Sequence, residues 1–508
     1  MRKAGTIAAA MLVAAGVLTS VQATAYTVSG RHIYDDAGRI VQLKGVNWFG
    51  FETTNYTVHG LWARNWKQMI QQIKAQGFNA VRLPFCPTTL RGVMPTSIDY
   101  SLNADLAGKN SLALLDAVIA EFDRQGLYVL LDHHRADCKD IAELWYTPAY
   151  TEAQWLADLK FVANRYRNRP RVIGIDLKNE PHGAATWGTR NTATDWNLAT
   201  GRAATQVLGV APHWLIFVEG IGDQALCSSG EPAFWGENLA PIACAPSPVP
   251  ANRLVLSPHT YGPDVHVQRY HNAANFPANM PAIWDRHWGF AIASAPVVLG
   301  EFGGKYGEGH GRDRAWQNAL VDYLIGKRVN SGFYWSWNPN SSDTGGVLRD
   351  DWKTVRSDKM SLLRRLWAAP SGTGTGGSTG GSSGGSTSGG GTTTGGTTAG
   401  GSSTGGSTGG TTGGGSTGGS SGGTAPALSV TEQRSSDWGS GYCSDVVVRN
   451  LGGTAVDWDI RLTVEGRLNQ AWNVTWSQSG STVSARGLDW NRSVAPNTTR
   501  EWGYCADR

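Results

Sequence analysis

The chain has 508 residues, which is enough for more than one domain. Its 44 Lys and Arg nearly balance its 40 Asp and Glu, so we expect no nucleic-acid partner, which would need a strongly basic surface. The 22 Trp are unusual: Trp is too apolar to be scattered over a surface, so many should pack in a core or bind flat apolar faces.

The N-terminus has the three-part layout of a secretory signal peptide. A basic start, Met1-Arg-Lys, precedes a long apolar run that ends in the small-x-small cleavage site Ala23-Thr-Ala25. A membrane anchor is the alternative, but the run is short for a spanning helix and its flank looks cleavable. No later stretch is apolar enough to cross a bilayer. We therefore expect cleavage near Tyr26 and a secreted, extracellular product with no membrane partner.

Six cysteines in an exported chain indicate disulfides rather than a metal site, and no CxxC or HxxxH spacing supports zinc. We expect no metal and no cofactor. The expected pairs are Cys86–Cys138, Cys227–Cys244 and Cys443–Cys505. The third pair is the firmest, because its two cysteines are the only ones in the C-terminal part of the chain. Pairing among the other four stays open.

From about Ser371 to Gly423 the chain is almost wholly Gly, Ser and Thr. Such a segment cannot bury enough apolar surface to fold, so it should be a flexible tether, with an end-to-end distance of roughly 40 Å for about 50 residues. The expected domains are a signal peptide (1–25), a large unit (26–370), the linker (371–424) and a small unit (425–508).

The large unit contains repeated apolar runs, separated in several places by amphipathic stretches such as Trp66–Lys74 and Ser111–Phe122. Strand and helix alternating eight times over this length predict a (β/α)8 TIM barrel. The expected strands lie in Ile40–Gly50, Asn79–Phe85, Tyr128–His134, Val172–Pro181, His213–Gly220, Arg253–Tyr261, Pro296–Gly303 and Ser331–Asn338.

Active residues of such barrels lie at the C-terminal ends of the strands. Polar or aromatic side chains recur at this end of six or more of the runs, which indicates one shared site. They are Arg82, Asp132 to Arg135, Asn179, Glu180, Glu219, His259, Tyr261, Glu301, Trp335 and Trp337.

Three of these stretches carry a specific resemblance. Asn179-Glu180-Pro181, Gly300-Glu-Phe-Gly303 and Tyr334–Gly346 resemble the signature stretches of family 5 glycoside hydrolases, most closely the bacterial endo-β-1,4-glucanases. The resemblance covers essentially all of residues 26–370. It implies retaining hydrolysis of a β-1,4-glucan such as cellulose, which needs two carboxyl groups about 5 Å apart.

The resemblance assigns Glu180 as the acid/base and Glu301 as the nucleophile. The acid must hold its proton, so we expect burial and its negative neighbour to raise the pKa of Glu180. Arg82 should keep Glu301 ionised, and Tyr261 should donate a hydrogen bond to it.

The remaining roles concern the sugar. By the same resemblance, Asn179 should bind the sugar 2-hydroxyl, and His259 should help to place the acid/base or the substrate. His134 should contact the sugar next to the cleaved bond, and Trp335 should lie under the reacting sugar. Glu219 ends the fifth strand, but a mechanism with two carboxylates does not need it, so we interpret it as structural.

Trp48 and Trp235 are our candidates for stacking on further glucose rings. An indole suits the apolar face of a glucose ring. For each of these two side chains, a place in the core is the equal alternative.

The small unit has short alternating strands and no convincing helix, which predicts an all-β sandwich. Leu468–Gly480 and Asp489-Trp-Asn491 resemble a family 2 carbohydrate-binding module of the cellulose-binding kind. The resemblance implies a flat strip of Trp438, Trp472 and Trp490 that stacks on cellulose.

Two other Trp of this unit, Trp458 and Trp476, should be core. Arg434, Arg467 and Arg492 give the unit more positive charge than such a module is expected to carry.

The leading hypothesis is a secreted, monomeric endoglucanase tethered to a cellulose-binding module. One rival applies the same chemistry to mannan, xyloglucan or mixed-linkage glucan. Another is a non-catalytic protein that binds cell-wall glycan. The presence of both Glu180 and Glu301 with their supporting residues favours catalysis.

Overall fold

The computed structural model describes residues 25–223, 230–309, 311–369, 428–437, 439–472, 474–488 and 491–508. The expected signal peptide, up to residue 24, and the expected linker lie outside the described residues. The chain divides into two compact units, Met1–Gly376 and Gly377–Arg508. No helix among the described residues is long and apolar enough to span a membrane.

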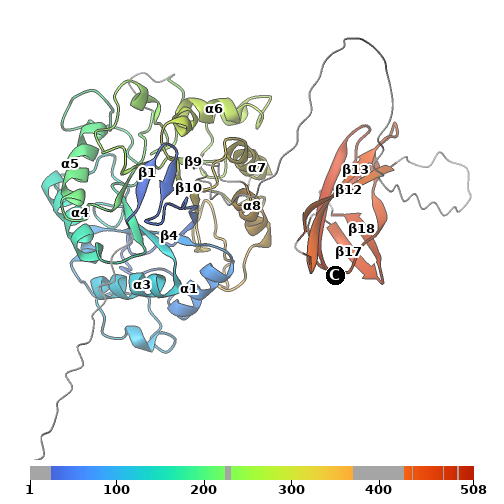
Figure 1. Ribbon diagram of the computed structural model, residues 1–508, viewed down its shortest axis with the longest axis horizontal. Coiled ribbons are helices and arrows are strands. Elements are labelled where there is room, and N and C mark those ends of the chain that lie inside the picture. Colours follow the sequence, from blue (N-terminus) through green and yellow to red (C-terminus); the bar gives the residue numbers. More distant parts are fainter. Residues whose placement is uncertain are drawn as a thin grey trace, which may run out of the picture. The chain divides into compact units, whose positions relative to one another are not determined.

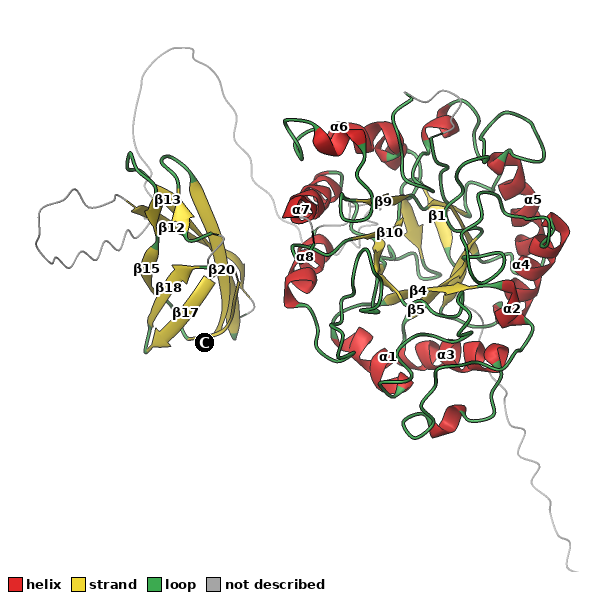
Figure 2. Ribbon diagram, turned by 180° about the vertical axis from the view of Figure 1, so that it is seen from behind, coloured by secondary structure: helices red, strands yellow, loops and turns green. Residues whose placement is uncertain are grey.

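The first unit is a parallel barrel surrounded by helices (Figures 1 and 2). Its strands are hydrogen-bonded in the order β8-β7-β6-β5-β4-β3-β11-β10-β9. They are β3 (Lys44–Asn47), β4 (Ala80–Phe85), β5 (Tyr128–His133), β6 (Val172–Asp176), β7 (Leu215–Val218), β8 (Leu254–Leu256), β9 (His259–Tyr261), β10 (Leu299–Gly303) and β11 (Gly332–Trp335).

Two of these segments, β8 and β9, share the sixth position of the barrel. The chain between them contains Pro258, which has no N–H to donate to a neighbouring strand. A parallel bridge between Leu256 and Val297 and the pairing of His259 with Glu301 both join this position to the seventh, which closes the barrel. The predicted (β/α)8 fold is confirmed, since each expected run contains its strand.

Helices cover the outside of the barrel (Figure 2). In α1, Met69, Ile70 and Ile73 are buried, and the Asn65 side chain caps the helix by accepting the N–H of Lys67. The helices are α1 (Trp66–Ala75), α2 (Pro87–Leu90), α3 (Ser111–Gln125), α4 (Glu152–Tyr166), α5 (Trp196–Leu208), α6 (Met280–His287), α7 (Gly311–Gly326) and α8 (Ser357–Trp367). Short 3-10 turns are η1 (Ala104–Leu106), η2 (Ala240–Ala243), η3 (Arg269–Asn272) and η4 (Gly289–Ala293).

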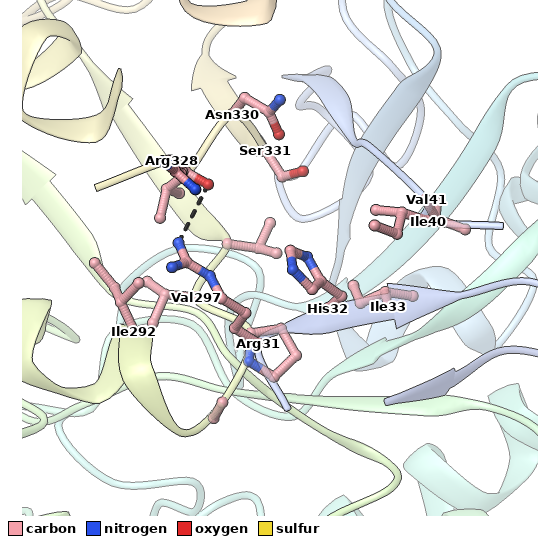
Figure 3. Close-up of a pocket in the computed structure, with 14 residues that line it drawn as sticks. Arg31, His32, Ile33, Ile40, Val41, Ile292, Val297, Arg328, Asn330 and Ser331 are labelled. Carbon is pink, nitrogen blue, oxygen red and sulfur yellow. Dashed lines mark hydrogen bonds between the residues drawn. The ribbon is translucent and has the colours of Figure 1, made fainter. Parts of the chain in front are cut away.

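The N-terminal end of the barrel is closed by a hairpin of β1 (Thr27–Ser29) and β2 (His32–Tyr34). Arg31, in the turn of this hairpin, donates to the main-chain oxygens of Lys327 and Arg328, and Figure 3 shows the bond to Arg328. The cavity left here measures about 40 Å³, which holds no more than a few water molecules. This cavity therefore has no room for a larger ligand.

Inside the barrel, side-chain alternation stacks an apolar layer below a charged one. Ala80, Leu130 and Phe217 are buried near the hairpin. Two residues further along the same strands, the inward side chains are Arg82, Asp132 and Glu219, all fully buried. The polar layer therefore lies at the C-terminal ends of the strands, as the barrel fold predicts for a site.

The second unit is an all-β sandwich, as predicted. The sheets are β12-β13-β20-β16, β15-β18-β17 and β14-β19, all antiparallel. Trp458 is buried, as predicted, whereas Trp476 is 36% exposed and is not a core residue. The strands are β12 (Leu428–Asp437), β13 (Gly441–Asn450), β14 (Val456–Asp457), β15 (Asp459–Thr463), β16 (Arg467–Trp472), β17 (Val474–Ser479), β18 (Thr482–Gly487), β19 (Ser493–Val494) and β20 (Thr499–Asp507).

Two of the three expected disulfides are confirmed. Cys86–Cys138 ties the residue after β4 to the loop after β5, and Cys443–Cys505 joins the neighbouring strands β13 and β20. Cys227 lies outside the described residues, so the pair Cys227–Cys244 stays a prediction, although Cys244 is itself disulfide-bonded.

Candidate active site

Arg82 lies at the centre of the charged layer and contacts four carboxyl groups. Its guanidinium nitrogens lie 3.1 Å from Asp132, 3.1 Å from Asp176, 3.2 Å from Glu219 and 2.6 Å from Glu301. Burial lowers the pKa of Arg82, but the carboxylates together raise it well above its usual value. Arg82 is thus a permanent cation that compensates several buried negative charges.

The two predicted catalytic carboxyl groups face each other across His259. Oxygens of Glu180 and Glu301 and a ring nitrogen of His259 all lie within 4.8 Å of one another. Glu301 accepts hydrogen bonds from Arg82 and from the Tyr261 hydroxyl, both at 2.6 Å. The Glu180 carboxyl group is bonded to His259 Nδ1 at 3.2 Å.

The expectation that the pKa of Glu180 is raised is wrong for the free chain. Burial raises this pKa, but the hydrogen bond and the positive charge of His259 lower it, and the net result lies below the usual value. Burial lowers the pKa of His259, whereas Glu219 and Glu301 raise it well above its usual value, so the ring is charged. Burial raises the pKa of Glu301, the charges of His259 and Arg82 lower it, and the neighbouring Glu180 raises it, so that it stays above its usual value.

A cleft of about 870 Å³ opens above these groups. Of the residues expected to contact sugar, His134, Asn179, Trp335 and Trp235 line it. Trp335 stacks on His134, with 5.6 Å between ring centroids, and on Phe49, with 5.3 Å. These rings form an aromatic floor on one side of the catalytic pair.

Trp235 is 48% exposed and stacks face to face on His182, with ring centroids 3.7 Å apart. The indole is therefore not a core residue, and its stacking on a sugar stays a prediction. His182 also lines the cleft, and its place directly after the Asn179-Glu180-Pro181 motif was the signal that could have identified it.

The expectation for Trp48 is wrong. Its side chain is fully buried, donates Nε1–H to the His59 carbonyl, and packs against Phe122 of α3. Asn47 points into the barrel, so alternation turns Trp48 outward and Phe49 back to the cleft. Phe49 is the aromatic residue that the sequence analysis missed.

Both oxygens of Glu219 have protein partners, which is consistent with the structural role that we expected. One lies 3.2 Å from Arg82, and the other accepts the main-chain N–H of Glu180 at 2.8 Å. Lys178, also missed, is buried beneath the same motif.

Two residue groups bring ligand atoms close enough for a metal ion: Asp176, Glu219 and His259, and Glu180, His259 and Glu301. In both groups Arg82 already donates to a carboxylate. A metal ion at either place would compete with that guanidinium, so the donor sets suit a cation poorly.

In the second unit, Trp438, Trp490 and the side chain of Trp472 lie outside the described residues. Their predicted role therefore stays a prediction. The positive charge that stood out in the sequence is partly balanced, since Arg434 pairs with Asp437 and Glu465. Arg492 pairs with Asp457.

Residues 37–341 match the family Cellulase (glycosyl hydrolase family 5), and residues 428–508 match the family Cellulose binding domain. The chain is similar to the major extracellular endoglucanase of Xanthomonas campestris pv. campestris, with 57% identity over 507 residues, 99% of both chains. An endoglucanase of Paenibacillus polymyxa is 45% identical over 345 residues, 67% of this chain and 86% of the relative.

Solved structures of endoglucanases are also similar to this chain. The catalytic domain of the Xanthomonas campestris pv. campestris major endoglucanase has a TM-score of 0.67 at 66% identity, covering 67% of this chain and 99% of that domain. A hyperthermophilic endocellulase from the archaeon Pyrococcus horikoshii has a TM-score of 0.67 at 46% identity, covering 69% of this chain and 100% of that one. The chain therefore belongs to the cellulases of glycosyl hydrolase family 5 and carries a C-terminal cellulose-binding domain.

Proposed function

We propose that the chain is a secreted endo-β-1,4-glucanase that cleaves internal bonds of cellulose with retention of configuration. The observation that carries the proposal is the closeness of Glu180 and Glu301, whose oxygens lie within 4.8 Å at the base of an open cleft. Retaining enzymes need this short separation because one carboxylate attacks the sugar directly. In inverting enzymes the two groups lie further apart, which leaves room for the attacking water molecule.

Glu301 acts as the nucleophile. Two hydrogen bonds of 2.6 Å, from Arg82 and Tyr261, stabilise its ionised form and orient one oxygen toward the sugar. This oxygen bonds to the anomeric carbon as the glycosidic bond breaks, and a glycosyl-enzyme forms.

Glu180 acts as the acid and then the base. It gives its proton to the departing glycosidic oxygen and later takes a proton from the water that releases the sugar from Glu301. In the free chain the His259 cation lowers the pKa of Glu180. A bound glucan removes its remaining contact with water, which favours the protonated carboxyl group in the complex.

Two residues that line the cleft, Asn179 and His134, have side-chain nitrogens left over to hydrogen-bond a sugar. Asn179 Oδ1 accepts from Arg82, and its buried Nδ2 has no hydrogen-bond partner among the described residues. That N–H₂ group is available to the sugar 2-hydroxyl. His134 Nδ1 is bonded to Asp132 at 2.6 Å, which leaves Nε2 for the sugar.

The cleft suits a polymer. Trp335 and Phe49 lie at its floor and the exposed Trp235 offers a further aromatic face, so more than one sugar of a glucan chain can stack along the cleft. Binding in the middle of a chain gives cleavage of internal bonds.

The other parts of the chain support action on an insoluble substrate outside the cell. Residues 1–25 are the signal peptide, 26–370 the catalytic unit, 371–424 the tether, and 425–508 the module whose Trp438, Trp472 and Trp490 stack on cellulose. The enzyme works as a monomer and needs no cofactor for this chemistry.

The test is a product profile on cello-oligosaccharides and manno-oligosaccharides of equal length. We expect kcat/KM to be at least about 100-fold higher for the cello series, with internal cleavage. Equal or higher values for the manno series would contradict cellulose as the substrate. Removal of the module from residue 425 onward should lower activity on crystalline cellulose and leave activity on cellotetraose unchanged.

A further inference from the structure

The main chain at Glu180 has an unusual conformation. Its φ is +56°, in the left-handed region that only Gly and, less readily, Asn and Asp adopt without strain. A side chain held there persists only if its surroundings determine it, and such residues cluster at functional sites. We therefore asked which groups hold this peptide segment.

Four polar contacts fix the two peptide bonds that flank Glu180. The Glu180 N–H donates to Glu219 at 2.8 Å, and its carbonyl accepts from His182 Nδ1 at 2.8 Å. Lys178 Nζ donates to the carbonyl of Asn179 at 2.5 Å and lies 3.4 Å from the carbonyl of Glu180. An anion thus holds the N–H side of the turn, and a cation bridges the carbonyls on both sides of the Glu180 Cα atom.

Of these groups, Lys178 is the one whose burial should cost the fold the most stability. Its side chain is buried, and among the described residues it makes no ion pair within 4.0 Å with a carboxylate. Burial lowers the pKa of Lys178 to about 8, although Glu219 and Glu180 oppose the shift. A buried ammonium that bonds only main-chain carbonyls destabilises the fold compared with an apolar chain of the same size. Packing alone would be served better by Met.

We propose that Lys178 is a positioning residue for acid catalysis: its ammonium clamps the two carbonyls that flank Glu180 and so aims this carboxyl group at the departing oxygen. The proposal rests on the proposed role of Glu180 as the acid/base. Lys178 does not touch the sugar. It acts through the conformation of Glu180, while His182, covered by Trp235, holds the other side of the same carbonyl.

The test compares two substrates whose leaving groups differ strongly in their need for acid. Cellotetraose has a poor leaving group that must be protonated, whereas 2,4-dinitrophenyl β-cellobioside loses a stable phenolate without help. We expect K178M to lower kcat/KM for cellotetraose by about 10- to 100-fold and for the aryl cellobioside by less than about threefold. An equal loss on both substrates, or no loss on either, would overturn the proposal.

A second variant covers the case in which K178M does not fold. K178Q is neutral but keeps a shorter donor, and the same difference between the two substrates is expected, with a smaller loss on cellotetraose. The matched control is K359M, because Lys359 is also buried and donates to a main-chain carbonyl, that of Thr344, away from Glu180. K359M should lower the melting temperature and leave the ratio of the two kcat/KM values unchanged.

The variant E180A separates this proposal from the assignment of the acid itself. If Glu180 is the acid, E180A lowers kcat/KM for cellotetraose by about 1,000-fold or more and for the aryl cellobioside by less than about tenfold. If E180A lowers both equally, the acid assignment fails. If E180A behaves as expected and K178M lowers both equally, only the role of Lys178 fails.

Discussion

The inside of the barrel has two layers of side chains. Each strand contributes one residue to the lower layer and the residue two positions later to the upper layer. In the lower layer, Leu130 and Phe217 fill the barrel and the β1–β2 hairpin closes it. In the upper layer, Asp132 and Glu219 occupy the next inward positions and surround Arg82. The lower layer buries apolar surface and stabilises the fold. The upper layer carries desolvated charge that costs stability and is kept for chemistry.

The largest effect should come from the reacting group of the upper layer. We expect Glu301→Ala to lower kcat on carboxymethyl cellulose on the order of 10⁴-fold or more, because no other oxygen can form the glycosyl-enzyme. Reducing-sugar release measures this. The control is Glu121→Gln, which changes a buried carboxylate outside the barrel, on α3, and should leave kcat unchanged. Similar activity of Glu301→Ala and wild type would sink the mechanism.

Breaking the centre of the upper layer should damage both activity and stability. Arg82→Met removes one of the two 2.6 Å donors to Glu301 and takes the guanidinium away from Asp132, Asp176 and Glu219. We expect kcat/KM to fall by about 1,000-fold and the free energy of unfolding to fall by about 3–5 kcal/mol. Kinetics and urea denaturation measure the two effects.

The lower layer supplies the contrast. Leu130→Ala removes buried apolar volume only, so the free energy of unfolding should fall by about 2–5 kcal/mol while kcat/KM of the folded protein stays within about twofold. If Leu130→Ala lost activity as Arg82→Met does, or if Arg82→Met kept it, the two layers would not differ in the way described.

The neighbours Phe49 and Trp48 repeat this contrast between the cleft and the core. Phe49→Ala should raise KM for cello-oligosaccharides by about 10-fold and also lower the melting temperature, because Phe49 lines the cleft but is itself buried against Trp335. Trp48→Ala should lower the free energy of unfolding by about 3–5 kcal/mol and leave KM unchanged. A raised KM for Trp48→Ala, with an unchanged KM for Phe49→Ala, would instead identify Trp48 as a sugar contact.

The smallest expected effect is a shift between two pH profiles. Acid catalysis is lost as pH rises through the pKa of Glu180. In the free chain His259 lowers this pKa, and in the complex the glucan shields Glu180 from water and raises it. The basic limb of kcat/KM should therefore lie at a lower pH than that of kcat, because the first profile reports the free enzyme and the second the complex. Coincident limbs would contradict this.

Much of the fold could be predicted because each barrel strand is buried on both faces and is therefore an apolar run. The strand ends also identified Arg82, Glu180 and Glu301, since parallel strands bring their C-terminal ends to one edge. Trp48 was misplaced because closeness to a strand end does not say which face a side chain takes. The inward Asn47 decides that, and its contacts with Gly300 and Phe333 are distant in sequence.

The direction of the Glu180 pKa and its main-chain conformation could not be predicted for a similar reason. His259 and Glu219, which control them, lie 79 and 39 residues away along the chain. Only the closed barrel brings these groups together. The charge of Lys178, one residue before the recognised motif, acquires a meaning only when its two carbonyl partners are known.

The central claim is that Glu301 becomes covalently bonded to the sugar while Glu180 supplies the proton. Incubation with 2,4-dinitrophenyl 2-deoxy-2-fluoro-β-cellobioside, which slows release of the intermediate, followed by proteolysis and mass spectrometry, tests it directly. We expect one fluorocellobiosyl group on the peptide that contains Glu301, at the carboxyl group of that residue. A label on Glu180, or an unlabelled enzyme that releases products with inverted anomeric configuration, would contradict the account.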